Sequence, residues 1–540
     1  MTKFIEHIGE IPVFKGEIQR KDIDKKVRGW LLPLELQGER EMIVLYDPQH
    51  TEFDLFEMYS VAHLFQSEGW KVRNESALPM VLTDIRHGKK RGESVQLDKE
   101  SPYRTVFTDI ITKAIEIGAS DIHVESRMEE ATVRLSTPGG KLDIKRLTST
   151  FATSMIRFLY DWEAGSGKGS SEGYYKGDIQ QQKARIEYQT PLGVAELRVQ
   201  ITPAFPEGGV DTVIRILLVR SPAYMAQLSK ARSLESLGYL PADIINIRNA
   251  VHLPNGASIW AGTVNSGKST SIANIIRAAI AEMRRRIKVV TLEDPPETEI
   301  LGATQVPVDK MRLGLEMAGV KDEIDGRLYA EGIKTALRMD LDMLFIGEIR
   351  GSEMALPVTD AIRSGHPTFT TIHAGSSVEA LGRLWNLGLD IMDLASPTFI
   401  NLIVYQKLVP GLCPNCRIPT ETLPALVSDH AGDIQKWYQA QGIVPHFYER
   451  NEAGCDHQNC YAGITRRLLI AETFFLTDDL RVKLMERNLV TLRRAWLEGG
   501  GRPIAHHGLI RVGTGEVAMS DLLRESVRWT DMIEWVRYGR

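Results

Sequence analysis

The spacing of hydrophobic and polar residues changes near position 236. Before it, a helix-like pattern over 106–118 leads into an alternating run at 120–125 that is typical of a half-buried strand, and further strands are predicted over 195–201 and 212–219. After it, short apolar runs alternate with helical patterns. We therefore expect an α/β region from about 236, with a parallel sheet covered by helices on both faces.

Four strands are predicted in this α/β region, over residues 257–260, 288–292, 343–346 and 368–372. At 540 residues the chain is too long for one hydrophobic core, since cores stop growing at about 250 to 300 residues. We expect three or four domains. The predicted limits give a region of unknown role at 1–100, a smaller α+β domain at 101–225, the α/β domain at 236–404, a cysteine-bearing module at 405–475 and short helices at 476–540.

Composition and charge narrow the class of protein. The chain is 43% hydrophobic and 25% charged, an ordinary globular balance, and its net charge of -5 gives no reason to expect nucleic acid as a direct partner. We see no secretory signal, and no run approaches the roughly 18 apolar residues of a membrane-spanning helix. We therefore expect a cytoplasmic protein that reaches any membrane through its partners.

A phosphate-binding loop is the strongest motif in the chain. Residues 262–269 read GTVNSGKS and match the Walker A pattern, with an apolar strand before them and a helical pattern after them. Glycines in such a loop let backbone N–H groups turn toward phosphate oxygens at a helix N-terminus. Lys268 is expected to reach the β and γ phosphates of ATP, and the Ser269 hydroxyl to bind Mg²⁺. The predicted nucleotide-binding residues are Gly262, Thr263, Val264, Asn265, Ser266, Gly267, Lys268, Ser269 and Thr270.

Two acidic segments follow strands of the same predicted sheet, at the edge where open α/β sheets bind ligands. Glu348 follows the strand at 343–346, and it is our candidate for holding Mg²⁺ through water or polarising the attacking water. Glu293 and Asp294 follow the strand at 288–292, on a turn that two prolines keep from becoming helical. Alone they would form an exposed acidic loop, but beside a phosphate-binding loop they are candidates for catalysis.

His373 ends a third strand, at 368–372, on the same sheet edge. A lone histidine is more often a structural residue. Its position after a strand of a nucleotide-binding core favours a place in the active site instead.

Together these boxes resemble the secretion ATPase superfamily, which contains the motors of type II secretion and of type IV pili. The Walker A loop, the Asp box at 293–297, the Walker B box at 347–350 and the His box at 371–373 occur in the family's order and at compatible spacing. The resemblance spans about residues 100–475. It implies a RecA-like ATPase domain preceded by a smaller, PAS-like α+β domain, a homo-hexameric ring, and an inner-membrane platform protein as partner.

The smaller domain also resembles its counterpart in this family. Its run at 119–125, ASDIHVE, is similar to the family's signature there, and the runs at 196–199 and 213–217 resemble arginine-bearing strands. In the family such arginines face the nucleotide. By this resemblance Arg198 and Arg215 would act as arginine fingers that neutralise charge on the γ-phosphate; the alternative is that they are surface arginines on strands.

The chain departs from the family's pattern at four places. Gly351 replaces the Asp after the Walker B box, Ala374 and Gly375 replace the Thr-Asn after the His box, residues 340–342 read DLD instead of DPD, and Lys334 stands at a usual Arg. These changes indicate a divergent branch, such as a type IVb or plasmid-encoded system. They leave the Lys, Ser and Glu of ATP hydrolysis in place.

The four cysteines fall in two short-spaced pairs, Cys413 with Cys416 and Cys455 with Cys460. Clustered cysteines in a cytosolic protein favour a metal over disulfides, and four thiolates fit a closed, structural Zn²⁺ site. The alternative is two reduced pairs without metal, because the second spacing is wider than that of the commonest zinc knuckle. In the family that the chain resembles, assembly ATPases carry such a module, whereas retraction and conjugative ATPases generally lack it.

We therefore expect an ATP-hydrolysing ring motor, peripheral at the inner membrane, that powers assembly of a type IV pilus or a type II secretion pseudopilus. One alternative is a nucleic-acid or conjugative type IV secretion translocase, which the acidic net charge disfavours. Another is a scaffold that binds nucleotide without hydrolysing it, which Glu348 disfavours.

Overall fold

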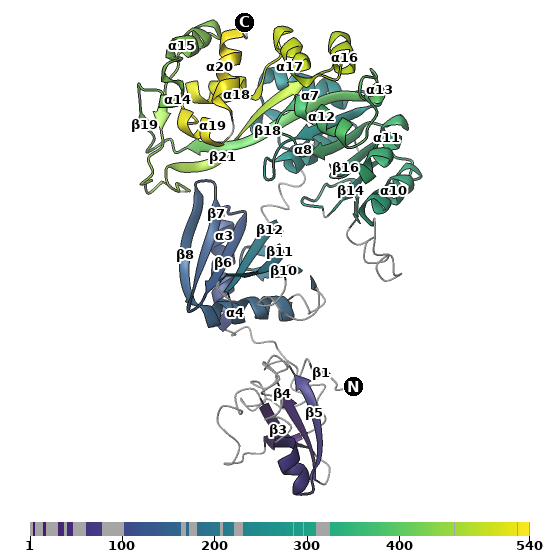
Figure 1. The fold of residues 1–540 in the computed structure, drawn as a ribbon, viewed down its shortest axis with the longest axis vertical. Coiled ribbons are helices and arrows are strands. Elements are labelled where there is room, and N and C mark those ends of the chain that lie inside the picture. The colour runs from purple at the N-terminus through teal and green to yellow at the C-terminus, as the bar shows by residue number, and fades with distance from the viewer. Residues whose placement is uncertain are drawn as a thin grey trace. The chain divides into compact units, whose positions relative to one another are not determined.

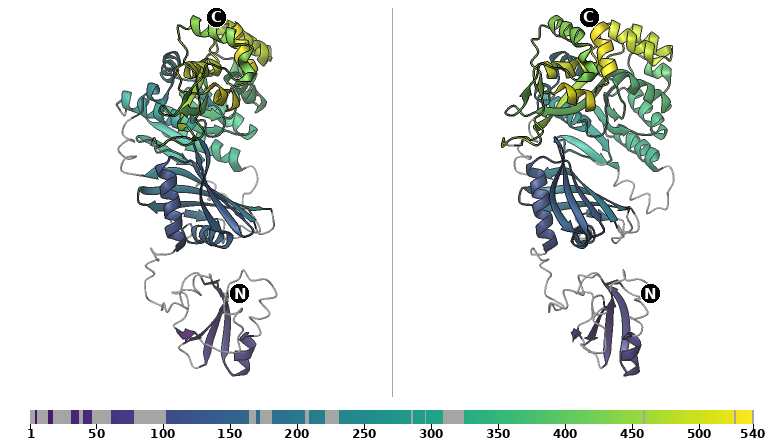
Figure 2. Two further views of the ribbon diagram at one scale, coloured as in Figure 1. Left: turned by 90° about the vertical axis from the view of Figure 1, so that its left-hand side faces the viewer. Right: turned by 60° about the vertical axis from the view of Figure 1, so that its left-hand side comes forward.

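The computed structural model contains two units, Met1–Ser101 and Pro102–Arg540 (Figures 1 and 2). The described residues are 4–5, 14–17, 31–36, 40–46, 61–77, 102–163, 169–171, 181–205, 209–220, 231–308 without 285 and 295, and 324–538 without 458 and 526. The first unit is a small sheet, and the second holds all the elements with predicted chemistry.

The first unit contains a five-stranded sheet in the order β1-β5-β4-β3-β2. Leu31, Met42 and Val44 of its mostly apolar central strands are buried against Val61 and Phe65 of a short helical stretch. This unit therefore has a hydrophobic core of its own. Its strands are β1 Phe4–Ile5, β2 Phe14–Glu17, β3 Leu31–Leu36, β4 Glu41–Tyr46 and β5 Lys71–Ala77.

Residues 102–220 form a seven-stranded antiparallel sheet in the order β8-β7-β6-β12-β11-β10-β9, with α3 along one face (Figure 2). Phe107, Ile110 and Ile111 of α3 are buried in its core, because they recur at helical spacing. The predicted helix and strands of this region are confirmed, while its likeness to a PAS domain stays a prediction. The elements are α3 Pro102–Glu116, β6 Asp121–Arg127, β7 Glu130–Thr137, β8 Gly140–Thr148, α4 Ser149–Arg157, β9 Gly169–Ser171, β10 Gln182–Thr190, β11 Gly193–Ala204 and β12 Gly209–Arg220.

The second seven-stranded sheet has the order β15-β14-β16-β17-β13-β18-β21. All its neighbouring strands are parallel except β21, which runs antiparallel to β18 at one edge. The four predicted strands are all present, and the predicted parallel sheet is confirmed. The strands are β13 Ala257–Ala261, β14 Val289–Glu293, β15 Ala303–Pro307, β16 Met343–Ile349, β17 Thr368–Ile372, β18 Ile400–Leu412 and β21 Ile464–Phe474.

Helices cover both faces of this sheet (Figure 1), which explains why its strands read as unbroken apolar runs. Along β13, Trp260 belongs to a cluster with Ile272 of α8, whereas Ile259 and Ala261 belong to the cluster on the other face. The helices are α6 Leu234–Leu237, α7 Pro241–Val251, α8 Lys268–Glu282, α10 Ile324–Leu337, α11 Ala355–Arg363, α12 Ser377–Asn386, α13 Ile391–Leu394, α14 Ala425–Ser428, α15 Ala431–Ala440, α16 Asp478–Met485, α17 Leu489–Glu498, α18 Ile504–Gly513, α19 Met519–Glu525 and α20 Trp529–Tyr538. Among the described residues, no helix has the length and apolar character needed to cross a membrane.

The cysteine-bearing segment is inserted between two strands of the sheet. β18 ends at Leu412 and β21 begins at Ile464, so both strands overlap the range 405–475 that the sequence assigned to a separate module. The segment between them holds α14, α15 and two short strands, β19 Ile418–Pro419 and β20 Tyr448–Glu449. The predicted limits therefore fall inside one sheet, because the apolar runs next to the cysteines continue the strands without a turn signal.

The C-terminal helices share a core with the sheet. Glu472 of β21 is buried and accepts hydrogen bonds of 2.7 Å from the backbone N–H and the hydroxyl of Ser377 and from the N–H of Ile504. Its carboxylate thus joins the first turns of α12 and α18, where the helix dipoles favour negative charge. The predicted short helices at 476–540 are confirmed, but their buried side chains belong to the hydrophobic cluster of the sheet.

Two buried histidines of α18 should make the folded protein sensitive to acid. His507 is fully buried, with its Nδ1 accepting the Ala471 N–H at 3.1 Å, and the ring of His506 packs against Trp437 and Trp535. Burial lowers the pKa of His506 to about 4 and that of His507 to about 3. An unfolded histidine titrates near pH ~6.5. Both groups therefore bind protons on unfolding once the pH falls below that value.

We predict that the free energy of unfolding decreases by about 2 kcal/mol per histidine between pH 7 and pH 5, in addition to any change from other groups. Denaturant titrations at the two pH values measure this loss. His506→Phe keeps an aromatic ring beside Trp437 and Trp535 and should remove one histidine's share of it. A loss that stays the same size in His506→Phe would contradict the assignment.

Candidate active site

The predicted phosphate-binding loop turns sharply between β13 and α8. A Cβ atom at Gly262 would lie 2.5 Å from both Gln406 O and Ser266 Oγ, so the close approach of these groups requires glycine. Gly267 has a φ of 84° and is the N-cap of α8, which begins at Lys268. The loop thus lies at the N-terminus of a 15-residue helix, where backbone N–H groups and the helix dipole favour phosphate.

The other predicted loop residues follow the same turn. Asn265 adopts a positive φ of 60°, and the Val264 side chain is exposed. Ser269 and Thr270 lie in the first turn of α8, directly after Lys268. A hydroxyl is therefore placed where the Mg²⁺ ligand of a Walker A loop is expected.

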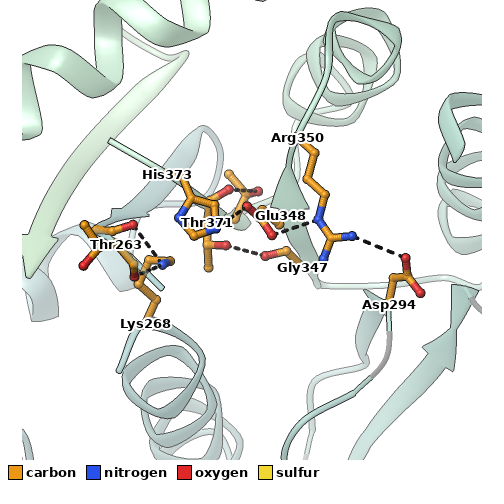
Figure 3. A network of polar contacts seen from close by, with 10 residues as sticks. Thr263, Lys268, Asp294, Gly347, Glu348, Arg350, Thr371 and His373 are labelled. Carbon is orange, nitrogen blue, oxygen red and sulfur yellow. Dashed lines mark hydrogen bonds and ion pairs between the residues drawn. The ribbon is translucent and has the colours of Figure 1, made fainter. Parts of the chain in front are cut away.

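Lys268 lies over this loop with its side chain mostly buried (Figure 3). Its Nζ donates to Gly262 O at 3.0 Å and to Thr263 O at 2.8 Å. Burial lowers the pKa of Lys268, while the charges of Glu348 and Glu297 raise it. The ammonium group therefore sits between the loop and the acidic residues that follow neighbouring strands.

Glu348 is the centre of a polar network at the carboxyl edge of the sheet (Figure 3). One of its carboxylate oxygens lies 2.8 Å from His373 Nε2, and the other lies 2.9 Å from Arg350 Nε. Arg350 also reaches Asp294, with 3.5 Å between Nη1 and Oδ2. Only 17% of the Glu348 side chain is exposed. The structure thus brings together candidates from the Walker B, His and Asp boxes in one sheltered cluster.

His373 connects this cluster to the phosphate-binding loop. Burial lowers the pKa of His373 below its ordinary value. The charge of Glu348 raises this pKa, and the charge of Lys268 lowers it, but burial has the largest effect. The Nε2 atom of this ring is placed to hydrogen-bond the Glu348 carboxylate. Thr371 donates its hydroxyl to Gly347 O at 2.7 Å, which fastens the His-box strand to the Walker B strand.

Glu293 and Asp294 differ in their surroundings although they are adjacent. Glu293 is buried, and its carboxylate accepts hydrogen bonds from Thr291 Oγ1 at 2.6 Å and from Gln305 Nε2 at 3.0 Å. Burial raises the pKa of Glu293. Glu293 therefore supports the turn after β14, whereas Asp294 joins the Glu348 network through Arg350.

Two residues of this network were not assigned a role from the sequence. Arg350 belongs to the Walker B box and follows β16 directly, and its spacing of two residues from Glu348 is a signal that the two side chains share a face. Tyr329 of α10 is buried near the same groups; burial raises its pKa, as do the charges of Asp294 and Glu348, while Arg350 lowers it. No motif spacing points to Tyr329, because only the packing of α10 brings it there.

The two candidate arginine fingers lie side by side on the antiparallel sheet of residues 102–220. Arg198 of β11 is directly opposite Arg215 of β12, and Arg198 is exposed. Arg215 Nε lies 2.9 Å from the buried Asp121 Oδ1. Arg215 therefore has a structural partner within its own sheet, and the role of both arginines at the nucleotide stays a prediction.

The four cysteines come together although two of them are about forty residues from the others in sequence. The Sγ atoms of Cys413 and Cys455 are 3.7 Å apart, and those of Cys416 and Cys460 are 3.8 Å apart. All four Sγ atoms lie within 4.8 Å of one another. A tetrahedral Zn²⁺ with Zn–S bonds of about 2.3 Å separates its sulfurs by about 3.8 Å. Both the donor set and the spacing therefore fit a closed zinc site.

We predict that Cys413→Ser lowers the zinc content from one ion per chain to none, because three remaining thiolates hold the metal poorly. Metal binding contributes folding free energy, so residues 413–463 should become sensitive to proteases. Elemental analysis and limited proteolysis measure the two effects. Lys268→Ala is a control that should keep its zinc. Wild-type protein purified without chelators and lacking zinc would contradict the site.

Comparison with known proteins decides the family. Residues 96–524 match the family described as "Type II/IV secretion system protein". The chain belongs to this family. One curated relative is the putative type II secretion system protein E of Escherichia coli (strain K12). It is 26% identical to this chain over 431 residues, which are 79% of this chain and 77% of that protein. The type IV pilus assembly ATPase TfpB of Acinetobacter baylyi is 26% identical over 515 residues, or 92% and 78% of the two chains.

Solved structures agree on the fold of this family member. The X-ray structure of the Legionella pneumophila ATPase DotB covers 79% of this chain and 95% of its own, with a TM-score of 0.52 and 20% identity. At that identity the likeness concerns the fold alone. The fold of this chain is thus shared with that ATPase.

Proposed function

We propose that this protein hydrolyses ATP and that it works as a hexameric ring motor for assembly of a type IV pilus or a type II secretion pseudopilus. The observation that carries the proposal is the Glu348 carboxylate, bound by His373 and Arg350 at the strand edge that also presents Lys268. The names of the curated relatives support the direction toward assembly or secretion. We propose a peripheral place at the inner membrane, with a platform protein as partner.

In this proposal each residue has a distinct task. Residues 262–270 bind the phosphates through backbone N–H groups, and Lys268 compensates their charge. Ser269 would hold Mg²⁺, which neutralises charge that develops on the phosphates. Glu348 accepts the proton of the attacking water, His373 orients Glu348 through its Nε2–H, and Arg350 fixes the second carboxylate oxygen. Arg198 and Arg215 are proposed to compensate charge on the γ-phosphate from the smaller domain.

A phosphate-release assay on the purified full chain tests the proposal against its two alternatives. A motor of this kind should release phosphate from ATP with Mg²⁺ present, and double-stranded DNA should not change the rate. Binding of ATP without release would favour the nucleotide-binding scaffold. A rate that rises with DNA would favour a nucleic-acid translocase.

A further inference from the structure

Residues 231–240 come before β13 in the sequence, and they are fastened to the helix of the phosphate-binding loop. The Arg232 N–H donates to Asn274 Oδ1 of α8 at 3.0 Å. Arg511 of α18 donates to Gly238 O at 2.7 Å. The segment therefore reaches Tyr239 with its backbone held at both ends.

Tyr239 is the centre of a buried network of hydrogen bonds. Its hydroxyl donates to Gln406 Oε1 at 2.5 Å, lies 3.0 Å from Ser271 Oγ of α8 and accepts the Trp260 Nε1–H at 3.3 Å. All four side chains are at most 4% exposed. Burial raises the pKa of Tyr239 to about 12, so the hydroxyl keeps its proton at any working pH.

Gln406 extends this network of buried hydrogen bonds to the phosphate-binding loop. Its Nε2 donates to the backbone carbonyl of Ser266 at 2.8 Å, and a Cβ atom at Gly267 would come within 3.2 Å of the same Nε2. The backbone carbonyl of Gln406 approaches Gly262 in the same way. Gln406 of β18 therefore contacts the loop at both glycines, with its side chain at Gly267 and its backbone carbonyl at Gly262.

We propose that Tyr239 and Gln406 are positioning residues that set the conformation of the phosphate-binding loop according to the position of residues 231–240. This inference rests on the proposed ATPase function. A displacement of residues 231–240 then moves Tyr239, and Gln406 transmits the displacement to Ser266. Nucleotide affinity and the position of residues 231–240 are then coupled.

Tyr239→Phe in the full chain tests the relay. The change removes one oxygen, leaves Gln406 Oε1 without its donor and frees the amide to turn away from Ser266. We expect the KM for ATP to rise about tenfold while kcat changes little, because a loop that binds phosphate less well affects ground and transition states alike. Tyr438→Phe is the matched control, since that buried hydroxyl donates to Leu509 O at 2.7 Å; it should lower the Tm and leave the KM unchanged.

The double variant Tyr239→Phe/Gln406→Leu separates positioning from stability. Replacing both partners by apolar groups removes the unpaired acceptor, so the Tm should return toward the wild-type value. The KM should stay raised, because Ser266 O still lacks its donor. A KM that recovers together with the Tm, or a Tyr239→Phe protein with wild-type KM, would overturn the relay.

Arg511→Met addresses the link to residues 231–240. The change releases Gly238 O and leaves Gln406 and Ser266 in place, so the KM should rise, and it should rise no further in combination with Tyr239→Phe. Fully additive effects would overturn the relay. Wild-type protein that neither binds a fluorescent ATP analogue nor releases phosphate would refute the ATPase function itself, which distinguishes that failure from the failure of the relay.

Discussion

Glu348→Gln should lower ATP turnover by roughly a thousandfold, within the range that general base catalysis supplies, and leave ATP binding in place. The amide keeps the shape of the side chain but cannot accept a proton from water. It also offers a single acceptor oxygen to two donors, His373 Nε2 and Arg350 Nε. Phosphate release and binding of a fluorescent ATP analogue measure the two quantities separately.

Glu293→Gln is the matched control for this experiment. Glu293 is bound by Thr291 of β14 and Gln305 of β15, so replacing its carboxylate by an amide should lower stability more than turnover. If instead Glu293→Gln abolishes turnover and Glu348→Gln does not, the catalytic base belongs to the Asp box and our assignment is wrong.

Arg198→Ala and Arg215→Ala should each lower turnover by about 10³-fold without preventing nucleotide binding, the low end for a lost arginine finger. The prediction applies to the full chain, because both residues lie outside the sheet that carries the phosphate-binding loop. Arg185→Ala is the matched control. Arg185 is directly opposite Arg198 on β10 and binds Glu196, so its loss should leave turnover nearly unchanged.

Arg215 needs a second variant, because removing it leaves the buried Asp121 without its cation. Arg215→Lys keeps a positive charge near Asp121 but lacks the planar fork of the guanidinium. The Tm should therefore recover while turnover stays low. Normal turnover in both alanine variants would mean that these arginines serve only the antiparallel sheet.

The sequence predicted the parts of the site that depend on neighbours in the chain. The phosphate-binding loop is specified locally, since Gly262, Gly267 and Lys268 lie within seven positions of one another and the strand and helix around them have clear periodicity. The strands β14, β16 and β17, which carry Glu293 and Glu348 and precede His373, were found for the same reason. Parallel strands then bring these ends to one edge, so a correct topology largely implied the cluster.

The missing parts depend on contacts between distant segments. Gln406 lies 140 positions after Ser266, and nothing in the residues around it indicates a phosphate-binding loop as its neighbour. Tyr239 belongs to no sequence motif, and only its buried hydrogen bonds show its connection to the loop. The limits of the cysteine-bearing segment were missed because an apolar strand has the same appearance inside an insertion and at the edge of a sheet.

The pairing of β18 with β21 makes the cysteine-bearing segment an elaborated hairpin loop. Leu412 is paired with Ile464, so a short turn could join the two strands at that point without changing the sheet that holds the phosphate-binding loop. Such an excision would uncover Trp535 and His506, which now pack against Trp437. A minimal version of this protein would thus lack the predicted zinc site, provided that polar side chains replaced the aromatic surface left behind.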